Sequence, residues 1–266
     1  MTKLQYGILG TAQIARKNWR AIRNSGNSTL AAVASRSLDR ARQFIHECQT
    51  DEPFDTPPRA LGSYEELLAS PEIEGVYIPL PTGLRKEWVI RAARAGKHIL
   101  CEKPCAVSSD DLREMLHACR ENNVQFLDGV MFMHSRRLTR MREVLNDPGS
   151  IGDTRRIQSA FTFSAPPEFY EGNIRTQLAL EPHGCMGDVG WYCIRLSLWA
   201  MNWQMPRQHP LRKHRSHRTL RRTLFREWRL RRLLLLVRRQ QPAVGGHQRH
   251  ARLSAHRRFR PSRRRP

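Results

Sequence analysis

The sequence predicts an α/β fold: a doubly wound parallel sheet, then a truncated α+β second domain, then an arginine-rich tail that we expect to be disordered. Three observations predict it. Short apolar runs alternate with helical patterns over the first 130 residues, which is typical of a parallel sheet with helices on both faces. This alternation stops after Met131, and the composition changes again after Pro206. We therefore place the boundaries of the three regions at 1–130, 131–206 and 207–266.

The first region contains several apolar runs with the length of buried strands, at 4–9, 30–34, 75–80, 98–101 and 124–127. Helical patterns follow the first four runs, ending near residue 22 and then spanning about 38–48, 85–95 and 108–121. A short capped helix is expected at 63–68, and residues 50–60, rich in Pro, Asp and Thr, are expected to form a loop. In the second region, 138–145 and 189–199 are predicted helices and 156–163 is a predicted strand.

The charge of the chain is distributed unevenly. The chain has 46 Lys and Arg and 24 Asp and Glu, a formal net charge of +22 at pH 7. Residues 207–266 hold 21 of the basic residues and one acid, Glu227, which leaves 25 basic and 23 acidic residues (46 less 21 and 24 less one) in 1–206. A high positive charge suggests nucleic acid or a membrane surface as a partner. Here that charge belongs to the tail, and the first 206 residues have the balance of an ordinary soluble protein.

The cysteines and the apolar runs indicate a cytoplasmic protein. None of the six cysteines forms a C-x-x-C pair, so we expect reduced thiols and no metal site. The amino terminus lacks a charged region followed by a long apolar stretch, which predicts no signal peptide. The longest purely aliphatic run of the tail, 233–237, is far shorter than the ~20 residues that span a bilayer. We therefore expect no membrane partner.

A glycine-containing turn follows the first predicted strand. Gly10-x-Ala12-x-x-Ala15 is a relaxed form of the dinucleotide fingerprint, which needs a tight turn, close approach of a pyrophosphate and close packing of the helix. Ala12 departs from the usual glycine, so phosphate approach is strained rather than blocked. The alternative is an ordinary strand–helix turn. The fingerprint predicts cofactor contacts from Gly10, Thr11, Ala12, Gln13 and Ile14.

The end of the second predicted strand indicates which dinucleotide binds. Proteins that bind NAD carry an acid there for the ribose hydroxyls, whereas this chain has Ser35-Arg36-Ser37. Arg36 is suited to a 2′-phosphate, and the two serines can add hydrogen bonds. We predict NADP as the cofactor, with NAD as the second choice. The alternative is that Arg36 is a solvated arginine beside Asp39.

A lysine follows the predicted strand at 98–101. Glu102-Lys103-Pro104 places it at the carboxyl edge of the sheet, where open parallel sheets bind their ligands. An ammonium group held there can polarise a substrate oxygen. The alternative is a surface lysine in a turn.

Three features together resemble the glucose–fructose oxidoreductase/inositol dehydrogenase family (the Gfo/Idh/MocA-type oxidoreductases). They are the fingerprint, the string Ala95-Gly96-Lys97-His98-x-x-Cys101-Glu102-Lys103-Pro104, and Gly187-Asp188-Val189-Gly190-Trp191-Tyr192. The resemblance extends from residue 4 to about 205. It implies a Rossmann domain followed by an open mixed sheet, and hydride transfer between a nicotinamide cofactor and a small-molecule sugar, polyol or related alcohol or carbonyl. It also implies oligomerisation, which we expect the shortened second domain to impair.

The resemblance assigns the catalytic residues. Lys103 corresponds to the catalytic lysine, whose bond to Pro104 is often cis in the family. Asp188 would orient a substrate hydroxyl. Tyr192, as in the dihydrodiol and xylose dehydrogenase branch, would protonate the alkoxide in carbonyl reduction and act as the base in reverse. We expect the Lys103 ammonium to lower the pKa of Tyr192. The alternatives are a helix cap for Asp188 and a half-buried packing residue for Tyr192.

The resemblance also implies a cofactor-lining loop. Leu80, Pro81 and Thr82 would line the cofactor together with Glu102 and Lys103. Many members have a histidine where this chain has Arg85.

The tail has an unusual composition. Residues 207–266 contain no Asp, Asn, Ile, Met, Cys or Tyr, and they carry 20 Arg but one Lys. This resembles a gene of high GC content translated in the wrong frame, and we hypothesise a frameshift near codon 206. One alternative function is therefore a catalytically inactive cofactor-binding remnant. The other is nucleic-acid binding through the tail, but no aromatic platform or helix-turn-helix pattern accompanies it, so nucleic acid is not the expected partner.

Overall fold

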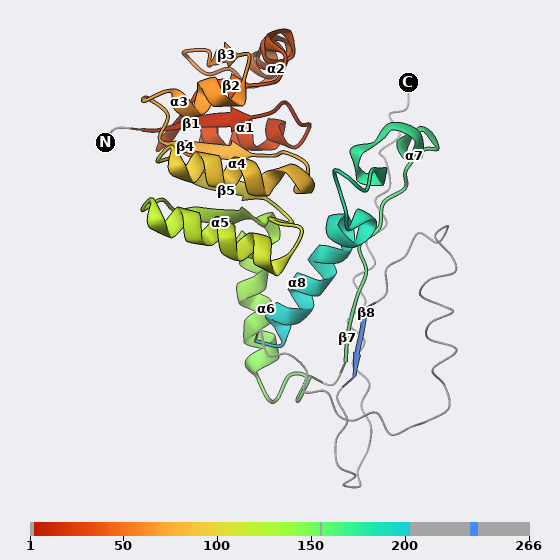
Figure 1. Ribbon diagram of the computed structural model, residues 1–266. Coiled ribbons are helices and arrows are strands. Elements are labelled where there is room, and N and C mark those ends of the chain that lie inside the picture. Colours follow the sequence, from red (N-terminus) through yellow and green to blue (C-terminus); the bar gives the residue numbers. More distant parts are fainter. Residues whose placement is uncertain (1–2, 155, 203–234, 239–266) are drawn as a thin grey trace, which may run out of the picture.

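The computed structural model describes residues 3–154, 156–202 and 235–238. Its amino-terminal part is built on one sheet of parallel strands: β1 (Leu4–Leu9), β2 (Ser28–Ala34), β3 (Arg59–Leu61), β4 (Gly75–Ile78), β5 (His98–Glu102) and β6 (Phe126–Gly129). The strand order is β3-β2-β1-β4-β5-β6, so the winding direction reverses between β1 and β4. The predicted doubly wound parallel sheet is confirmed (Figure 1).

Helices cover both faces of this sheet (Figure 1): α1 (Ala15–Asn24), α2 (Leu38–Asp51), α3 (Tyr64–Ala69), α4 (Thr82–Arg94) and α5 (Ser109–Glu121). One hydrophobic cluster joins the sheet to α1 and α2, and the other joins it to α3, α4 and α5. Adjacent residues of a strand point to opposite faces, so Ile8 belongs to the first cluster and Leu9 to the second. Every member of both clusters lies between Tyr6 and Phe126.

Serine caps set the starts of three of these helices. The side chains of Ser37, Ser63 and Ser108 each accept a hydrogen bond from the backbone N–H three residues on, at 3.4, 3.1 and 3.0 Å. The Asp111 carboxylate, three residues after the Ser108 cap, pairs with Lys86 at 2.8 Å. The ion pair with Lys86 is the largest cause that lowers the pKa of Asp111, and the bonds from Ser108 add to it.

Most elements of this part begin or end within three residues of the prediction, as β6 does (predicted at 124–127), and two differences concern β3 and α4. Strand β3 lies at the end of the segment 50–60, where a loop was predicted, and extends to Leu61. It has three residues, which directly follow Pro57 and Pro58, and so short a strand shows little alternation of apolar and polar residues. Helix α4 begins at Thr82, a turn before the predicted start at residue 85, and Pro81 occupies its N-cap position. The apolar periodicity that predicted the helix starts only after its first turn.

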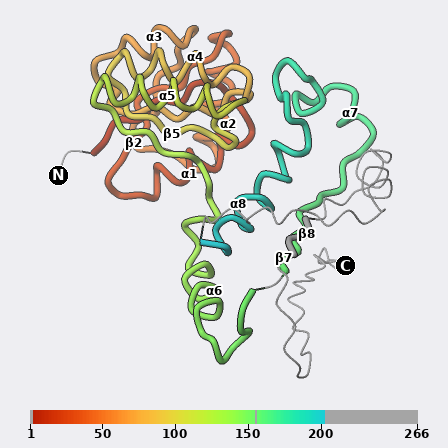
Figure 2. The backbone as a smooth tube through the Cα atoms, turned by 60° about the horizontal axis from the view of Figure 1, so that its bottom comes forward, coloured from red at the N-terminus to blue at the C-terminus, as the bar shows by residue number. Residues whose placement is uncertain are grey.

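The second region begins with a 3₁₀ turn (η1, Met131–His134) and continues through α6 (Arg136–Asn146), β7 (Arg156–Ser159), α7 (Glu168–Gly172), a further 3₁₀ turn (η2, Ile174–Thr176), a π-helical turn (η3, Met186–Gly190) and α8 (Trp191–Ala200). The carboxyl end of α8 meets α6 (Figures 1 and 2). There the Arg142 guanidinium donates to the Trp199 carbonyl and lies 4.2 Å from the centroid of the Trp199 ring.

Four residues of the arginine-rich tail are described. Leu235–Arg238 forms β8, which pairs antiparallel with β7. The sequence predicts no strand here, although Leu235, Leu236 and Val237 are apolar and valine favours strands. The rest of 207–266, and with it the expected disorder and the hypothesised frameshift, lies outside the described residues. None of the described helices has the length and apolar character needed to span a membrane.

Candidate active site

The predicted cofactor residues lie at one edge of the sheet. Gly10 follows β1, Ser35 follows β2, Leu80 follows β4 by two residues and Lys103 follows β5. Because all these strands are parallel, their carboxyl ends meet at the same edge. The reversal of strand order between β1 and β4 lies in the middle of this group.

The turn after β1 needs a glycine. Gly10 has φ +104°, and its N–H donates to the Ala34 carbonyl at 2.8 Å. A Cβ at this position would lie 3.1 Å from Cδ2 of Leu80, so the turn is packed directly against the loop after β4. Ala15 is fully buried where α1 meets the sheet, and Ala12 is partly exposed. Gly10 thus makes a tight turn, and Ala15 allows close packing of α1 on the sheet.

The segment after β2 combines a buried serine with an exposed arginine. Ser35 is 5% exposed, whereas Arg36 is exposed and Ser37 caps α2. Arg36 lies near the Tyr64 hydroxyl: burial raises the pKa of Tyr64, and the charge of Arg36 opposes this increase. Asp39, the neighbour considered for Arg36, forms an ion pair with Arg42 at 3.3 Å.

Lys103, Asp188 and Tyr192 come together although 85 residues separate the first two. The Lys103 ammonium donates to the carbonyl oxygen of Asp188 at 2.7 Å and to its Oδ1 at 2.9 Å. Nε of Arg175 lies 3.0 Å from the other carboxylate oxygen, Oδ2. The side chains of Lys103 and Asp188 are 11% and 19% exposed, and that of Arg175 is 45% exposed. The Lys103–Pro104 peptide bond is cis.

Tyr192 receives the lysine on the face of its ring. Nζ of Lys103 lies 4.6 Å from the ring centroid, a cation–π contact. Burial raises the pKa of Tyr192 to about 12, the charges of Glu102 and Asp188 add to the increase, and Arg175 opposes it. The expectation that Lys103 lowers this pKa is wrong. The reason is that the ammonium is paired with Asp188 and packs on the ring, while the nearby carboxylates disfavour the phenolate.

The Glu102 carboxylate accepts hydrogen bonds from Tyr77 and from the backbone of Lys103. The Tyr77 hydroxyl donates to its Oε1 at 2.7 Å, and the backbone N–H of Lys103 donates to Oε2 at 3.2 Å. Glu102 is 9% exposed. Burial, followed by the charge of Glu102, raises the pKa of Tyr77. The carboxylate therefore fixes the backbone from which the Lys103 side chain extends.

Three residues that the sequence interpretation left out of the site belong to its surroundings. Arg85 is buried and its guanidinium donates to the Leu80 carbonyl at 2.7 Å. Glu181 accepts from the Thr82 N–H and hydroxyl at 3.1 and 2.6 Å. Arg175 pairs with Asp188 as described. No motif in the sequence around Glu181 or Arg175 marks them as site residues. Arg85 stands where many family members have a histidine, and that replacement can be seen in the sequence.

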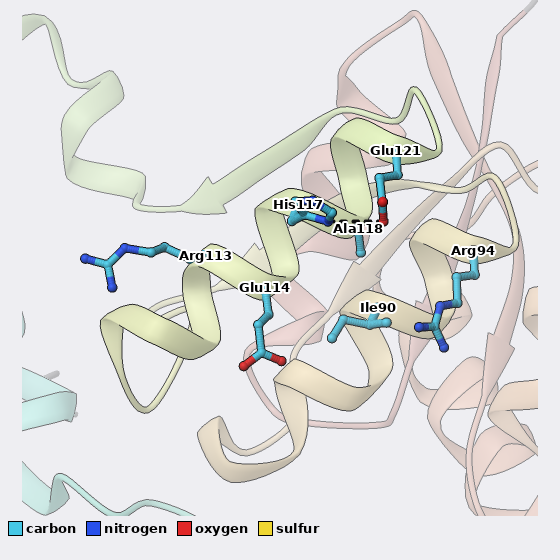
Figure 3. Close-up of a pocket in the computed structure, with 7 residues that line it drawn as sticks. All are labelled: Ile90, Arg94, Arg113, Glu114, His117, Ala118 and Glu121. Atoms are coloured by element: carbon cyan, nitrogen blue, oxygen red, sulfur yellow. Dashed lines mark ion pairs between the residues drawn. The ribbon is translucent and has the colours of Figure 1, made fainter.

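A groove lies between α4 and α5 (Figure 3). It has a volume of about 380 Å³ and is lined by Ile90, Arg94, Arg113, Glu114, His117, Ala118 and Glu121. His117 and Glu121 form an ion pair across one turn of α5 at 3.1 Å. The groove contains none of the predicted site residues. In the described part of the chain, no group of three or more His, Cys, Asp and Glu is arranged to hold a metal ion.

Comparison with protein families identifies the sheet domain. Residues 4–129 match an oxidoreductase family with an NAD-binding Rossmann fold. Residues 4–129 are a Rossmann domain of the Gfo/Idh/MocA oxidoreductase family. The matched range contains β1 to β6 together with Gly10 and Lys103, so the resemblance drawn from the motifs is confirmed.

Curated relatives extend the similarity beyond the Rossmann domain. The dTDP-3,4-didehydro-2,6-dideoxy-alpha-D-glucose 3-reductase of Streptomyces violaceoruber is 35% identical over 195 residues, 73% of this chain and 53% of that protein. The D-xylose 1-dehydrogenase (NADP(+)) 2 of Haloferax volcanii is 34% identical over 191 residues, 72% of this chain and 55% of that protein. The chain thus spans about half the length of the curated relatives it matches.

A solved member of the family has a similar structure. KijD10, a 3-ketoreductase from Actinomadura kijaniata in complex with NADP and TDP-benzene, superposes with a TM-score of 0.66 at 30% identity. The match covers 75% of this chain and 58% of that one.

Proposed function

We propose that this chain binds NADPH at the carboxyl edge of its Rossmann sheet and reduces a carbonyl group of a sugar or a related compound to the alcohol. The observation that carries the proposal is the contact of Lys103 with Asp188 and Tyr192 beside that edge. The 3-ketoreductase and the NADP-linked xylose dehydrogenase among its relatives support the substrate class. In this proposal 1–130 is the dinucleotide domain and 131–206 begins the substrate domain.

The cofactor residues fit NADP better than NAD. Gly10 allows a tight turn against Leu80, which brings the backbone close to a pyrophosphate. Arg36 is exposed at the end of β2, where an NAD-binding chain carries an acid. Its guanidinium would pair with the 2′-phosphate, with Ser35 and Ser37 beside it. The bound nicotinamide would supply the hydride.

The chemistry at the carbonyl follows from the charges of the site. The Lys103 ammonium would polarise the substrate oxygen, and Asp188 holds that ammonium in place. The Tyr192 hydroxyl, whose pKa is raised to about 12, is protonated at neutral pH and would donate a proton to the developing alkoxide. In the reverse reaction it would act as the base, and the raised pKa opposes the loss of its proton near pH 7.

Titration of the purified chain with NADPH and NADH, followed by nicotinamide fluorescence, tests cofactor binding. We expect tighter binding of NADPH, and we expect Arg36→Asp to weaken NADPH binding by about tenfold or more, the scale of a lost charge-assisted hydrogen bond. NADH binding should change far less. Failure of the wild-type chain to bind either dinucleotide would overturn the proposal.

Reduction of 3-keto-sugar nucleotides with NADPH, and oxidation of xylose with NADP⁺ for the reverse direction, test the chemistry. Lys103→Met should reduce the rate at saturating NADPH by roughly 10²-fold or more, as when an oxyanion donor is removed. A catalytically inactive remnant is the second candidate, because the chain spans about half the length of its relatives. Tight NADPH binding without turnover would favour it. The cytoplasmic location stays a prediction.

A further inference from the structure

We propose that Arg85 is a positioning residue that locks the cofactor-lining loop after β4 to the lysine-bearing loop after β5. Arg85 lies in the first turn of α4 and is 5% exposed. In the contacts described for the site, Arg85 touches neither the Lys103 ammonium nor Asp188. It acts through its hydrogen bonds to the backbone carbonyls of Leu80 and Pro104.

The guanidinium reaches both loops at once. Nε donates to the Leu80 carbonyl at 2.7 Å, and Nη1 donates to the Thr82 hydroxyl at 3.1 Å. Nη1 also donates to the carbonyl of Pro104, the residue after Lys103. Because a guanidinium is planar and its donors have fixed directions, one side chain sets the separation of these two loops. A lysine ammonium has no such geometry.

The second domain joins the same network through Thr82. The Thr82 hydroxyl accepts from Arg85 and donates to Oε2 of Glu181 at 2.6 Å. A buried cation is costly unless it is hydrogen-bonded, and here Nε and Nη1 of Arg85 are directed to two carbonyls and a hydroxyl. Removing the guanidinium would leave the Leu80 and Pro104 carbonyls without this donor, which favours opening of both loops.

Hydrogen exchange measured by mass spectrometry tests the coupling without any cofactor. In Arg85→Ala we expect amides in 80–84 and 103–107 to exchange about tenfold faster, the factor for one lost hydrogen bond. Guanidinium ion added at millimolar concentration should restore slow exchange, and NaCl at equal ionic strength should not. Arg94→Ala, an exposed arginine at the end of the same helix, is the matched control and should leave both loops unchanged.

NADPH binding provides a second measurement of the role of Arg85, and this one rests on the proposed function. Arg85→Ala should weaken NADPH binding by about tenfold, with rescue by guanidinium ion but not by NaCl. Arg85→Lys, which keeps the charge, should fall between wild type and Arg85→Ala in both measurements, and it decides the question if Arg85→Ala does not fold.

The two proposals fail in different ways. Unchanged exchange in both loops, or faster exchange spread equally over α1 and α2, would overturn the role of Arg85. Absence of NADPH binding by the wild-type chain would overturn the proposed function, while the exchange result would still decide the role of Arg85.

Discussion

Asp188 holds a cation on each carboxylate oxygen, Lys103 on Oδ1 and Arg175 on Oδ2. A carboxylate oxygen can accept more than one hydrogen bond, so a substrate hydroxyl that binds Asp188 would share an oxygen with one of these cations or displace it. Arg175 is the easier to displace, because its side chain is 45% exposed and an exposed ion pair contributes little. The orienting role expected for Asp188 thus points to Oδ2, on the side of Arg175.

The titration of Tyr192 should respond to its neighbours in opposite directions. Asp188→Asn removes a negative charge that helps to raise the pKa of Tyr192, so this pKa should fall below about 12. Arg175→Met removes a charge that opposes the increase, so the pKa should rise. Phenolate absorbance, measured as the difference from Tyr192→Phe in each background, follows this titration. Shifts in the same direction in both variants would contradict the electrostatic account.

The sequence predicted which residues come together at the site, but it did not predict the geometry of their contacts. Lys103, Asp188 and Tyr192 were chosen from motifs, and they are in contact. The effect on the Tyr192 pKa was predicted with the wrong sign, because it depends on whether the ammonium approaches the ring face or the hydroxyl. Glu181 was missed because its contact with Thr82 joins residues 99 positions apart.

At the level of elements, the β1–α1 turn depends on the absence of a side chain. Gly10→Ala should lower the free energy of unfolding by ~1–3 kcal/mol, since φ is +104° and the new Cβ would press on Leu80. Gly26→Ala is the matched control: φ is +75°, but the Cβ meets nothing within 4 Å. It should cost about 1 kcal/mol, from backbone strain alone. Urea denaturation measures both values, and equal costs would rule out the clash with Leu80.

The cap of α5 makes a smaller prediction. Ser108→Ala removes the acceptor for the Asp111 N–H and should destabilise the protein by ~1 kcal/mol. Ser109→Ala, one residue further on at an exposed position, should change stability by less than ~0.5 kcal/mol. Chemical denaturation of the two variants provides the comparison. A larger loss in Ser109→Ala would show that the cap is not what starts the helix.

Elements with a strong pattern were the ones that the sequence located. Strands β2 and β4 are apolar on both faces, and serine caps mark the starts of α2 and α5, so pattern and chemistry agree. Strand β3 has three residues and pairs only with β2 at the edge of the sheet. Its formation depends on that long-range pairing, which local propensity does not report.

At the level of the whole molecule, both hydrophobic clusters lie within 6–126. A fragment of residues 1–135 should therefore fold alone and unfold in one cooperative transition in urea. Its two tryptophans, Trp19 and Trp88, are buried and should keep a blue-shifted emission that moves to the red on unfolding. A gradual transition, or emission already typical of solvent-exposed indole, would show that the fold needs the second region.

Besides the contacts of Lys103, a short segment of the second region, 179–183, packs against this domain. The Gly83 N–H donates to the Leu180 carbonyl at 2.9 Å, Glu181 accepts from Thr82, and His183 lies 2.6 Å from the Val107 carbonyl. A Cβ on Gly83 would lie 2.5 Å from the Ala179 carbonyl oxygen, so the segment fits closely at the start of α4.

The close fit of this segment restricts which sequences can be joined to residues 1–135 in a chimeric protein. A designer who joins residues 1–135 to the carboxyl-terminal half of another member must keep glycine at position 83, where the incoming chain passes. The donor sequence must also supply a carboxylate to Thr82 and a carbonyl to Gly83. Donors that carry a glutamate at the equivalent of Glu181 should be compatible with this interface, and those that lack it would need that residue grafted with the domain.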